Sequence, residues 1–222
     1  EYLFLTDYER REVCKTSLVG EVLLAIGIPP RPDIYDKPEK YKPTDVCVAP
    51  DGSFYIFDCY GQPWVHRYTR SGSYIDSFGG DGDGPGKLRC PHGGWVDTRK
   101  KDPELYVADR GNNRIQVFTL DGKHKRFITG EMKQPCCFFQ FKNEMVVPDL
   151  QARLTILDIN DNPVAVLGDN PDAPKTPGWP NIQNHLQDGK FSSPHAACVD
   201  SHGDIYVVEW IDTGRVTKLI RQ

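Results

Sequence analysis

The sequence predicts an all-β fold, a β-propeller built from four-stranded blades, and three observations lead to this prediction. Twenty glycines and 18 prolines are spread along the 222 residues, which favours short strands and turns over long helices. A pattern of four short apolar runs recurs along the chain at a period of about 40 to 50 residues. Runs such as "IQVF" and "VTKL" alternate or stay apolar, as half-buried strands do. Repeats of this length with four strands each are typical of propeller blades.

The repeat is clearest when the segment from Lys42 is aligned with the segment from Cys90. Both contain Pro, an apolar run, a turn, a run that ends in Asp, a hairpin, a further run, a turn and a closing run. Asp-Gly, Ser-Gly and His-Gly pairs mark the turns. The blades are expected at residues 1–28, 42–80, 89–130, 134–168 and 193–222.

The first expected blade lacks its first strand and the last lacks its last strand. A closed ring has to pair its terminal strands or leave open edges. We therefore expect a single propeller domain over residues 1–222, present as an incomplete ring. Two connections between blades, residues 28–42 and 169–191, are long enough to be either functional or disordered. Trp179 and His185 in the second connection are expected either at a pocket rim or in an ordinary packed loop.

Charge and hydropathy exclude some classes of partner. The net charge of −4 and the lack of a basic stripe argue against nucleic acid. The longest apolar run, "LVGEVLLAIGI", is too short to span a bilayer and contains Glu21. We expect no membrane span, a small-molecule or peptide substrate, and a monomer.

The seven cysteines form no disulfide framework that can be read from their spacing. Cys47, Cys90 and Cys198 lie in or beside apolar runs, where a free thiol behaves as a small hydrophobic group. Mostly reduced, buried thiols are therefore expected. The sequence leaves the cellular compartment open.

The candidate site follows from the first strand of each blade, which is innermost in a propeller. The residues that follow the proline of this strand are Thr44, His92, Cys136 and His195. Strands from different blades aim these side chains at one channel mouth, where imidazoles bind metal ions and catalytic zinc keeps an open position. The alternative is that His92 and His195 are channel-mouth residues held by hydrogen bonds or water. Cys136 is either a thiolate ligand or a buried thiol.

The hairpins between the second and third strands lie on the same face. They place Tyr60 and Arg110 just after the strand that ends in Asp. A phenol can act as a general acid or base and a guanidinium can hold a carboxylate, although either residue can also be an ordinary surface side chain. A structural role is expected for the acids that end this strand in each blade, as acceptors across the hairpin or partners of Arg114, Arg153 and Arg215: Asp7, Asp58, Asp109, Asp149 and Glu209.

The repeats resemble NHL repeats, since "ELYVADRGNNRIQVFTLDGK" has their order of strand, Asp, Asn, Arg, strand and Asp-Gly. Residues 42–118 are also similar to peptidyl-α-hydroxyglycine α-amidating lyase (peptidylamidoglycolate lyase), through "PTDVCVAPDGSFYIFDCY", "CPHGGWVD" and "LYVADRGNNRIQVF". This resemblance implies a six-bladed ring when complete, an extracytoplasmic or secreted location, and a zinc ion held by three histidines from Pro-His strands. It places His92 and His195 on two zinc ligands, Tyr60 on the catalytic tyrosine and Arg110 on an active-site arginine.

The sequence departs from that family at three positions. The third zinc histidine would precede Glu1. Ala196 replaces the aspartate that binds calcium, which makes calcium doubtful, and Gly61 replaces a cysteine, so the family's disulfide at that position is absent. The functional expectation is a metal-dependent lyase with its site at the channel mouth, acting on a small or peptide-terminal α-hydroxy or carboxylate substrate. The alternative is a propeller without catalysis that binds a peptide, glycan or protein on its top face.

Overall fold

Short strands separated by glycine turns build the molecule, which was obtained as a computed structural model that describes residues 1–182 and 186–222. Gly52 and Gly122 turn two of the predicted Asp-Gly hairpins with φ of 86° and 82°, a backbone region that favours glycine. The all-β prediction is confirmed: the described residues contain strands and three short 3-10 helices, at Pro38–Lys40, Arg110–Asn112 and Ala173–Lys175. In the described parts of the chain, helices long and apolar enough to cross a bilayer are absent.

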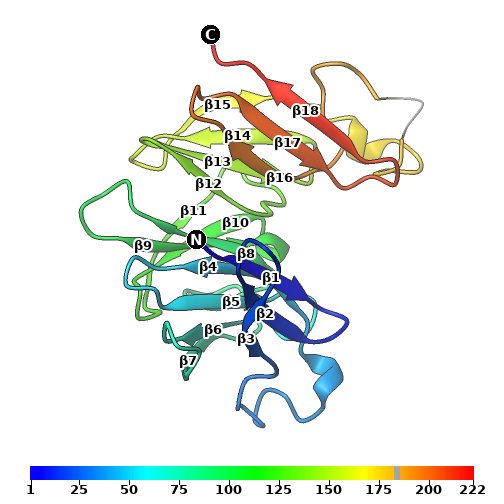
Figure 1. The fold of residues 1–222 in the computed structure, drawn as a ribbon. Coiled ribbons are helices and arrows are strands. Elements are labelled where there is room, and N and C mark those ends of the chain that lie inside the picture. The colour runs from blue at the N-terminus through cyan, green and yellow to red at the C-terminus, as the bar shows by residue number, and fades with distance from the viewer. Residues whose placement is uncertain (183–185) are drawn as a thin grey trace.

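Five antiparallel sheets follow one another along the chain (Figure 1). Three of them have four strands, as predicted. The second sheet contains β4 (Pro43–Val48), β5 (Phe54–Asp58), β6 (Trp64–Tyr68) and β7 (Tyr74–Gly79). The third contains β8 (Pro91–Asp97), β9 (Glu104–Asp109), β10 (Arg114–Phe118) and β11 (His124–Ile128). The fourth contains β12 (Phe139–Phe141), β13 (Glu144–Asp149), β14 (Arg153–Leu157) and β15 (Pro163–Leu167).

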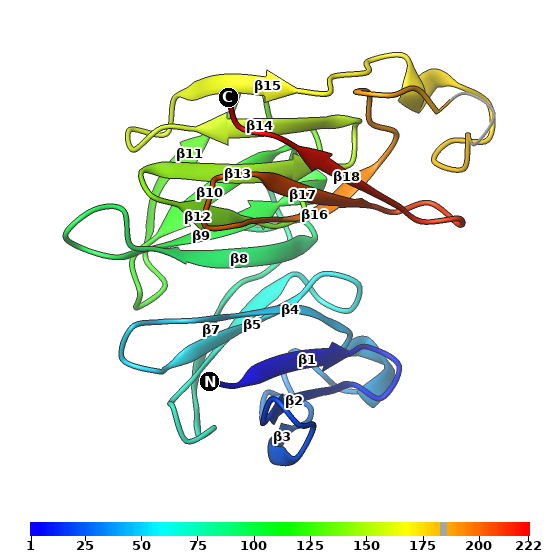
Figure 2. The same cartoon turned by 45° about the horizontal axis from the view of Figure 1, so that its top comes forward.

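The first and last sheets have three strands each. The first contains β1 (Leu3–Asp7), β2 (Glu12–Thr16) and β3 (Val22–Ile26), and the last contains β16 (Pro194–Val199), β17 (Ile205–Glu209) and β18 (Arg215–Leu219). Figures 1 and 2 show these two sheets at opposite ends of the series, with the four-stranded sheets between them. The described residues form five blades, and the sequence analysis expects six only for a complete ring.

The core lies between neighbouring sheets, because a sheet buries its apolar faces by packing against the blades beside it. Phe57 of the second sheet and Val107 of the third belong to one buried cluster, and Val147 joins the third sheet to the fourth in another. The innermost strands also contact one another directly, β4 with β8 and β12 with β16. This packing brings the beginnings of strands from different blades to one channel mouth.

The two long connections are packed rather than disordered in their described parts. Tyr35 and Tyr41 in residues 28–42 are 7% and 0% exposed and join the core between the first two sheets. Trp179 donates a hydrogen bond from Nε1 to the Ser192 carbonyl at 2.9 Å, so it has the role of an ordinary packed loop residue. His185 lies outside the described residues.

Candidate functional site

The backbone is irregular where the candidate ligands occur. Pro43, Pro91 and Pro194 pair with the acids that end the neighbouring strands, and the register then shifts across Thr44, His92 and His195. A β-bulge leaves its residue outside the ladder and changes the direction of its side chain, and bulges are frequent next to active sites. The sequence contained the proline that begins each bulge but no visible sign of the register shift.

The fourth blade shows the same feature in a stronger form. Its first strand is expected from Pro135, but β12 begins only at Phe139, and Pro135 makes an isolated bridge with Asp149. The Cys136 amide donates to the Pro148 carbonyl at 3.0 Å. Cys136 therefore begins its blade at the position that His92 and His195 occupy in theirs.

The acids opposite these prolines have the structural role that was expected. Asp58 accepts hydrogen bonds from the amides of Lys42, Gly61 and Gln62. The equivalent acids of three other blades also accept hydrogen bonds from backbone amides. Asp109 accepts from Arg89, Asp149 from Lys133 and Gln134, and Glu209 from Ser192 and Ser193. They thereby hold the chain just ahead of the first strand.

The predicted arginine partners of these acids are only partly right. Arg114 pairs with Asp109 at 2.7 Å, and Arg215 pairs with Glu209. Arg153 instead pairs with Glu131 at 2.7 Å and Asp169 at 3.0 Å. Asp149 already accepts several backbone amide hydrogen bonds, so its oxygens are satisfied without the arginine.

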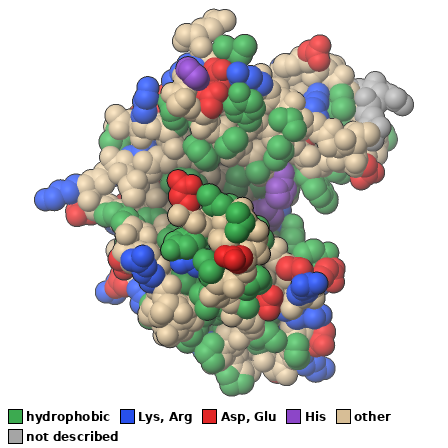
Figure 3. Space-filling model, in the orientation of Figure 1, with side chains coloured by type: hydrophobic (Ala, Val, Ile, Leu, Met, Phe, Trp, Pro, Cys, Tyr) green, Lys and Arg blue, Asp and Glu red, His purple; other side chains and the backbone are tan. Residues whose placement is uncertain are grey.

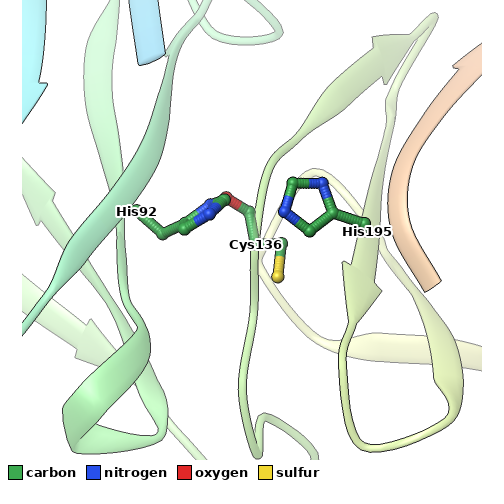
Figure 4. Close-up of side chains that lie close together, drawn as sticks. All are labelled: His92, Cys136 and His195. Carbon is green, nitrogen blue, oxygen red and sulfur yellow. The ribbon is translucent and has the colours of Figure 1, made fainter. Parts of the chain in front are cut away.

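Three side chains meet at the channel mouth (Figure 4): His92, Cys136 and His195. Their ligand atoms all lie within 4.8 Å of one another, and the two imidazole centroids are 4.8 Å apart with planes at 85°. Two blades remote in sequence thus direct their imidazoles to one point. The arrangement is a His/Cys group of the kind that binds metal ions.

Burial keeps these groups uncharged. Burial, together with the charges of Arg110 and His195, lowers the pKa of His92 to about 3. Burial and then Arg110 also lower the pKa of His195. Burial raises the pKa of the Cys136 thiol to about 12, although Arg110 opposes this shift. Both imidazoles are therefore in the neutral form that binds metals.

A hydrogen bond fixes which nitrogen of His92 is available. Its Nδ1 lies 3.0 Å from the Cys136 carbonyl oxygen, which can only accept, so Nδ1 carries the proton. The lone pair is then on Nε2. Backbone acceptors orient metal-binding histidines in this way and fix their tautomer.

Tyr60 and Arg110 lie beside this group. The ring centroid of Tyr60 is 5.9 Å from that of His92, and the Arg110 guanidinium carbon is 5.3 Å from the Tyr60 centroid. Both line a cavity of about 280 Å³ with His195, Leu150 and Trp210. Figure 3 shows histidine side chains in the recess between the two halves of the molecule. Leu150 and Trp210 are absent from the sequence-based expectation, although each directly follows the acid that ends its strand, as Arg110 does.

A disulfide joins Cys59 to Cys90, which corrects the expectation of a free thiol at Cys90. The two residues precede Tyr60 and Pro91, and they meet because the hairpin of the second blade lies beside the start of the third. Arg110 donates from one guanidinium nitrogen to both sulfurs, at 3.4 and 3.2 Å. Cys47 and Cys136 are buried thiols, but Cys198 is exposed.

Comparison with known proteins extends these observations. The chain is 30% identical over 112 residues to human NHL repeat-containing protein 3, a match that covers 49% of this chain and 31% of that protein. It is 33% identical over 87 residues to rat peptidylglycine alpha-amidating monooxygenase, over 37% of this chain and 9% of that protein. These matches span less than a third of each relative. No family model matches the sequence.

A solved structure shows the same fold. Inactive virginiamycin B lyase from Staphylococcus aureus, crystallised with quinupristin, superimposes with a TM-score of 0.63 at 14% identity and covers 99% of this chain and 66% of that one. At this identity the likeness concerns the fold alone. Together, the repeat pattern, the five sheets and these matches support the resemblance of the chain to NHL-type β-propellers and, over part of its length, to the peptide-amidating enzymes.

Proposed function

We propose that the chain forms the active site of a zinc-dependent, lyase-like NHL propeller that acts on a small or peptide-terminal α-hydroxy or carboxylate substrate. The observation that carries the proposal is the meeting of His92, Cys136 and His195 beside Tyr60 and Arg110. Nitrogen and thiolate donors suit zinc.

The chemistry of the three donors, His92, His195 and Cys136, suits a metal ion. Nε2 of His92 is left free by the hydrogen bond at Nδ1, and both imidazoles are neutral. A bound zinc ion would supply a Lewis acid for a hydroxyl or carboxylate oxygen. Cys136 would provide a third donor among the described residues, and binding would require it to lose its thiol proton.

Tyr60 and Arg110 have separate tasks in this proposal. The Tyr60 side chain is half exposed at the cavity, so its hydroxyl can exchange a proton with a bound substrate. The Arg110 guanidinium donates hydrogen bonds to the two disulfide sulfurs and lies over the Tyr60 ring, and no ion pair with a carboxylate is found for it among the described residues. Its guanidinium is available to hold a substrate carboxylate.

The test is the metal content of the full-length protein and of His92→Ala and His195→Ala variants. We expect zinc in the purified protein and its loss from both variants. His202→Ala is the control, because this histidine is exposed in a turn of the last blade. The proposal of a zinc-dependent enzyme would be rejected if the purified protein contained no transition metal or if both variants kept the metal content of the parent.

A binding propeller without catalysis is the second candidate. Two aromatic side chains on the top face, Tyr60 and Trp210, are 50% and 59% exposed, as in sites that recognise a peptide or other partner. Retained partner binding by a metal-free protein would favour this function over the lyase.

We also propose that the complete ring has six blades. Apolar side chains are exposed on the first sheet, at Leu3 and Val22, and on the last sheet, at Val208 and Val216. A sixth sheet would cover such residues. Solvent labelling of a longer chain should show these four side chains protected; full labelling would contradict the proposal.

A further inference from the structure

Two apolar side chains line the candidate cavity, and the proposed chemistry uses neither. Leu150 and Trp210 share the cavity of about 280 Å³ with Tyr60, Arg110 and His195. They come from the hairpins that follow β13 and β17, so the fourth and fifth blades supply the apolar part. The second and third blades supply Tyr60 and Arg110. The cavity therefore has a cationic part and an apolar part.

Trp210 is exposed, but its backbone is held firmly. Its amide donates to the Ser193 carbonyl at 2.8 Å, and the preceding Glu209 accepts from the amides of Ser192 and Ser193. Two residues further on, the Asp212 amide donates to the Asn181 side chain at 2.7 Å. An indole that is 59% exposed on such a support contributes little to the core and is well placed for binding.

Leu150 has the opposite character. Its side chain is 6% exposed, and its amide donates to the Gln134 carbonyl at 3.0 Å. Leu150 is therefore the buried residue of the apolar side of the cavity, and Trp210 is the exposed one. A cavity of about 280 Å³ falls just below the usual range of ligand pockets, which are about 300–1,000 Å³. It suits one apolar group next to an acid better than a long peptide.

We propose that Trp210 and Leu150 form a specificity wall that selects α-hydroxy acids carrying an aromatic or branched apolar substituent. The proposal rests on the proposed function, which assigns the acid to Arg110. The carboxylate lies at Arg110 and the substituent lies against Trp210, because burial of apolar surface is favourable only on that side of the cavity.

The experiment measures equilibrium binding of three probes to the zinc-loaded full-length protein: lactate, 3-phenyllactate and the uncharged 3-phenylpropanol. We expect 3-phenyllactate to bind at least about tenfold more tightly than lactate, from burial of the phenyl ring. Trp210→Ala should remove most of this preference, so that the variant binds lactate and 3-phenyllactate with similar affinities. Trp210→Phe should retain it. Tyr2→Ala removes a similarly exposed aromatic ring just before β1 and is the control.

Arg110→Ala separates this inference from the proposed function. If lactate and 3-phenyllactate bind equally well and Arg110→Ala weakens both to the same extent, the wall is overturned. The proposed binding of the acid by Arg110 then still holds. A second outcome is that 3-phenylpropanol binds in a way that depends on Trp210, while Arg110→Ala changes the affinity for neither acid. This result would support the wall and contradict the recognition of the acid by Arg110. A preference for the phenyl group that persists in Trp210→Ala would overturn the wall directly, and absence of binding by all three probes would overturn both proposals.

Discussion

The bulges of the third and fifth blades differ from those of the second and fourth in the side chain that they present. All four follow a proline opposite an acid, but two present His92 and His195, and the others present Thr44 and Cys136. Thr44 donates its hydroxyl proton towards the carbonyls of Phe57 and His92, at 3.2 and 2.8 Å. The same backbone feature thus presents candidate metal ligands in some blades and, in the second blade, a hydroxyl that supports the neighbouring bulge.

The largest expected effect comes from cutting the link beside the His92 bulge. The Cys59–Cys90 disulfide joins residues 31 apart, and a loop of this length contributes about 2–4 kcal/mol to stability. The Cys59→Ser, Cys90→Ser double variant should lose this amount in urea unfolding. Cys14→Ser, a thiol outside any disulfide, is the control. If the two variants unfold alike, the disulfide contributes nothing to the stability of the fold.

Cys136→Ser tests whether the fourth blade contributes a ligand to the proposed zinc site. Loss of a direct ligand should weaken zinc binding by at least about 100-fold, more than is typical for residues that only orient ligands. Zinc competition with a chelator measures this change. Cys137→Ser should bind zinc normally, because a hydroxyl can still donate to the His195 carbonyl as the thiol does at 3.4 Å. Normal affinity in Cys136→Ser would make Cys136 a buried thiol only.

Thr44→Val tests the supporting role of the second blade. Valine keeps the shape but removes the hydrogen bond to the His92 carbonyl, which should cost about 1 kcal/mol of unfolding free energy. Zinc affinity should fall less than in Cys136→Ser. Thr119→Val, at an exposed turn, provides the comparison for a hydroxyl outside the bulges. A larger loss of zinc binding than of stability would assign Thr44 to the metal site.

The last prediction concerns a pH dependence that arises at Asp45. Its carboxylate accepts from the amides of Val46 and Gly94, so it links the second bulge to the third, and burial raises its pKa to about 7. A raised pKa favours the protonated folded state, so this contribution is full below the ordinary pKa of 3.8 and disappears as the pH rises through about 7.

Asp45→Asn should therefore lose stability less steeply than the parent between about pH 4 and pH 7.5, as measured by urea unfolding. Asp51→Asn gives a matched contrast of opposite sign, because hydrogen bonds from Ser53 lower the pKa of Asp51. Its carboxylate stabilises the fold above the ordinary pKa, and this contribution is lost as the pH falls. Parallel pH profiles for the Asp45→Asn variant and the parent would contradict the burial of that charge.

The order of elements could be predicted from the sequence because it depends on local rules. Glycine turns, alternating apolar residues and the terminal acid of the second strand recur within each unit, and the sheets occur at those positions. The convergence of His92 and His195 could also be predicted from the sequence, because propeller geometry brings the starts of the innermost strands together.

Other features depended on contacts between segments far apart in the chain, which no local pattern records. The Cys59–Cys90 disulfide, the hydrogen bond from the Tyr35 hydroxyl to Asp58, and the partners of Arg153 all join segments from different parts of the chain. The sequence by itself determined which residues form strands and turns, through backbone preference and hydrophobic period. Only the tertiary structure decided which side chains share the cavity, because burial and direction at a bulge are set by the neighbouring blade.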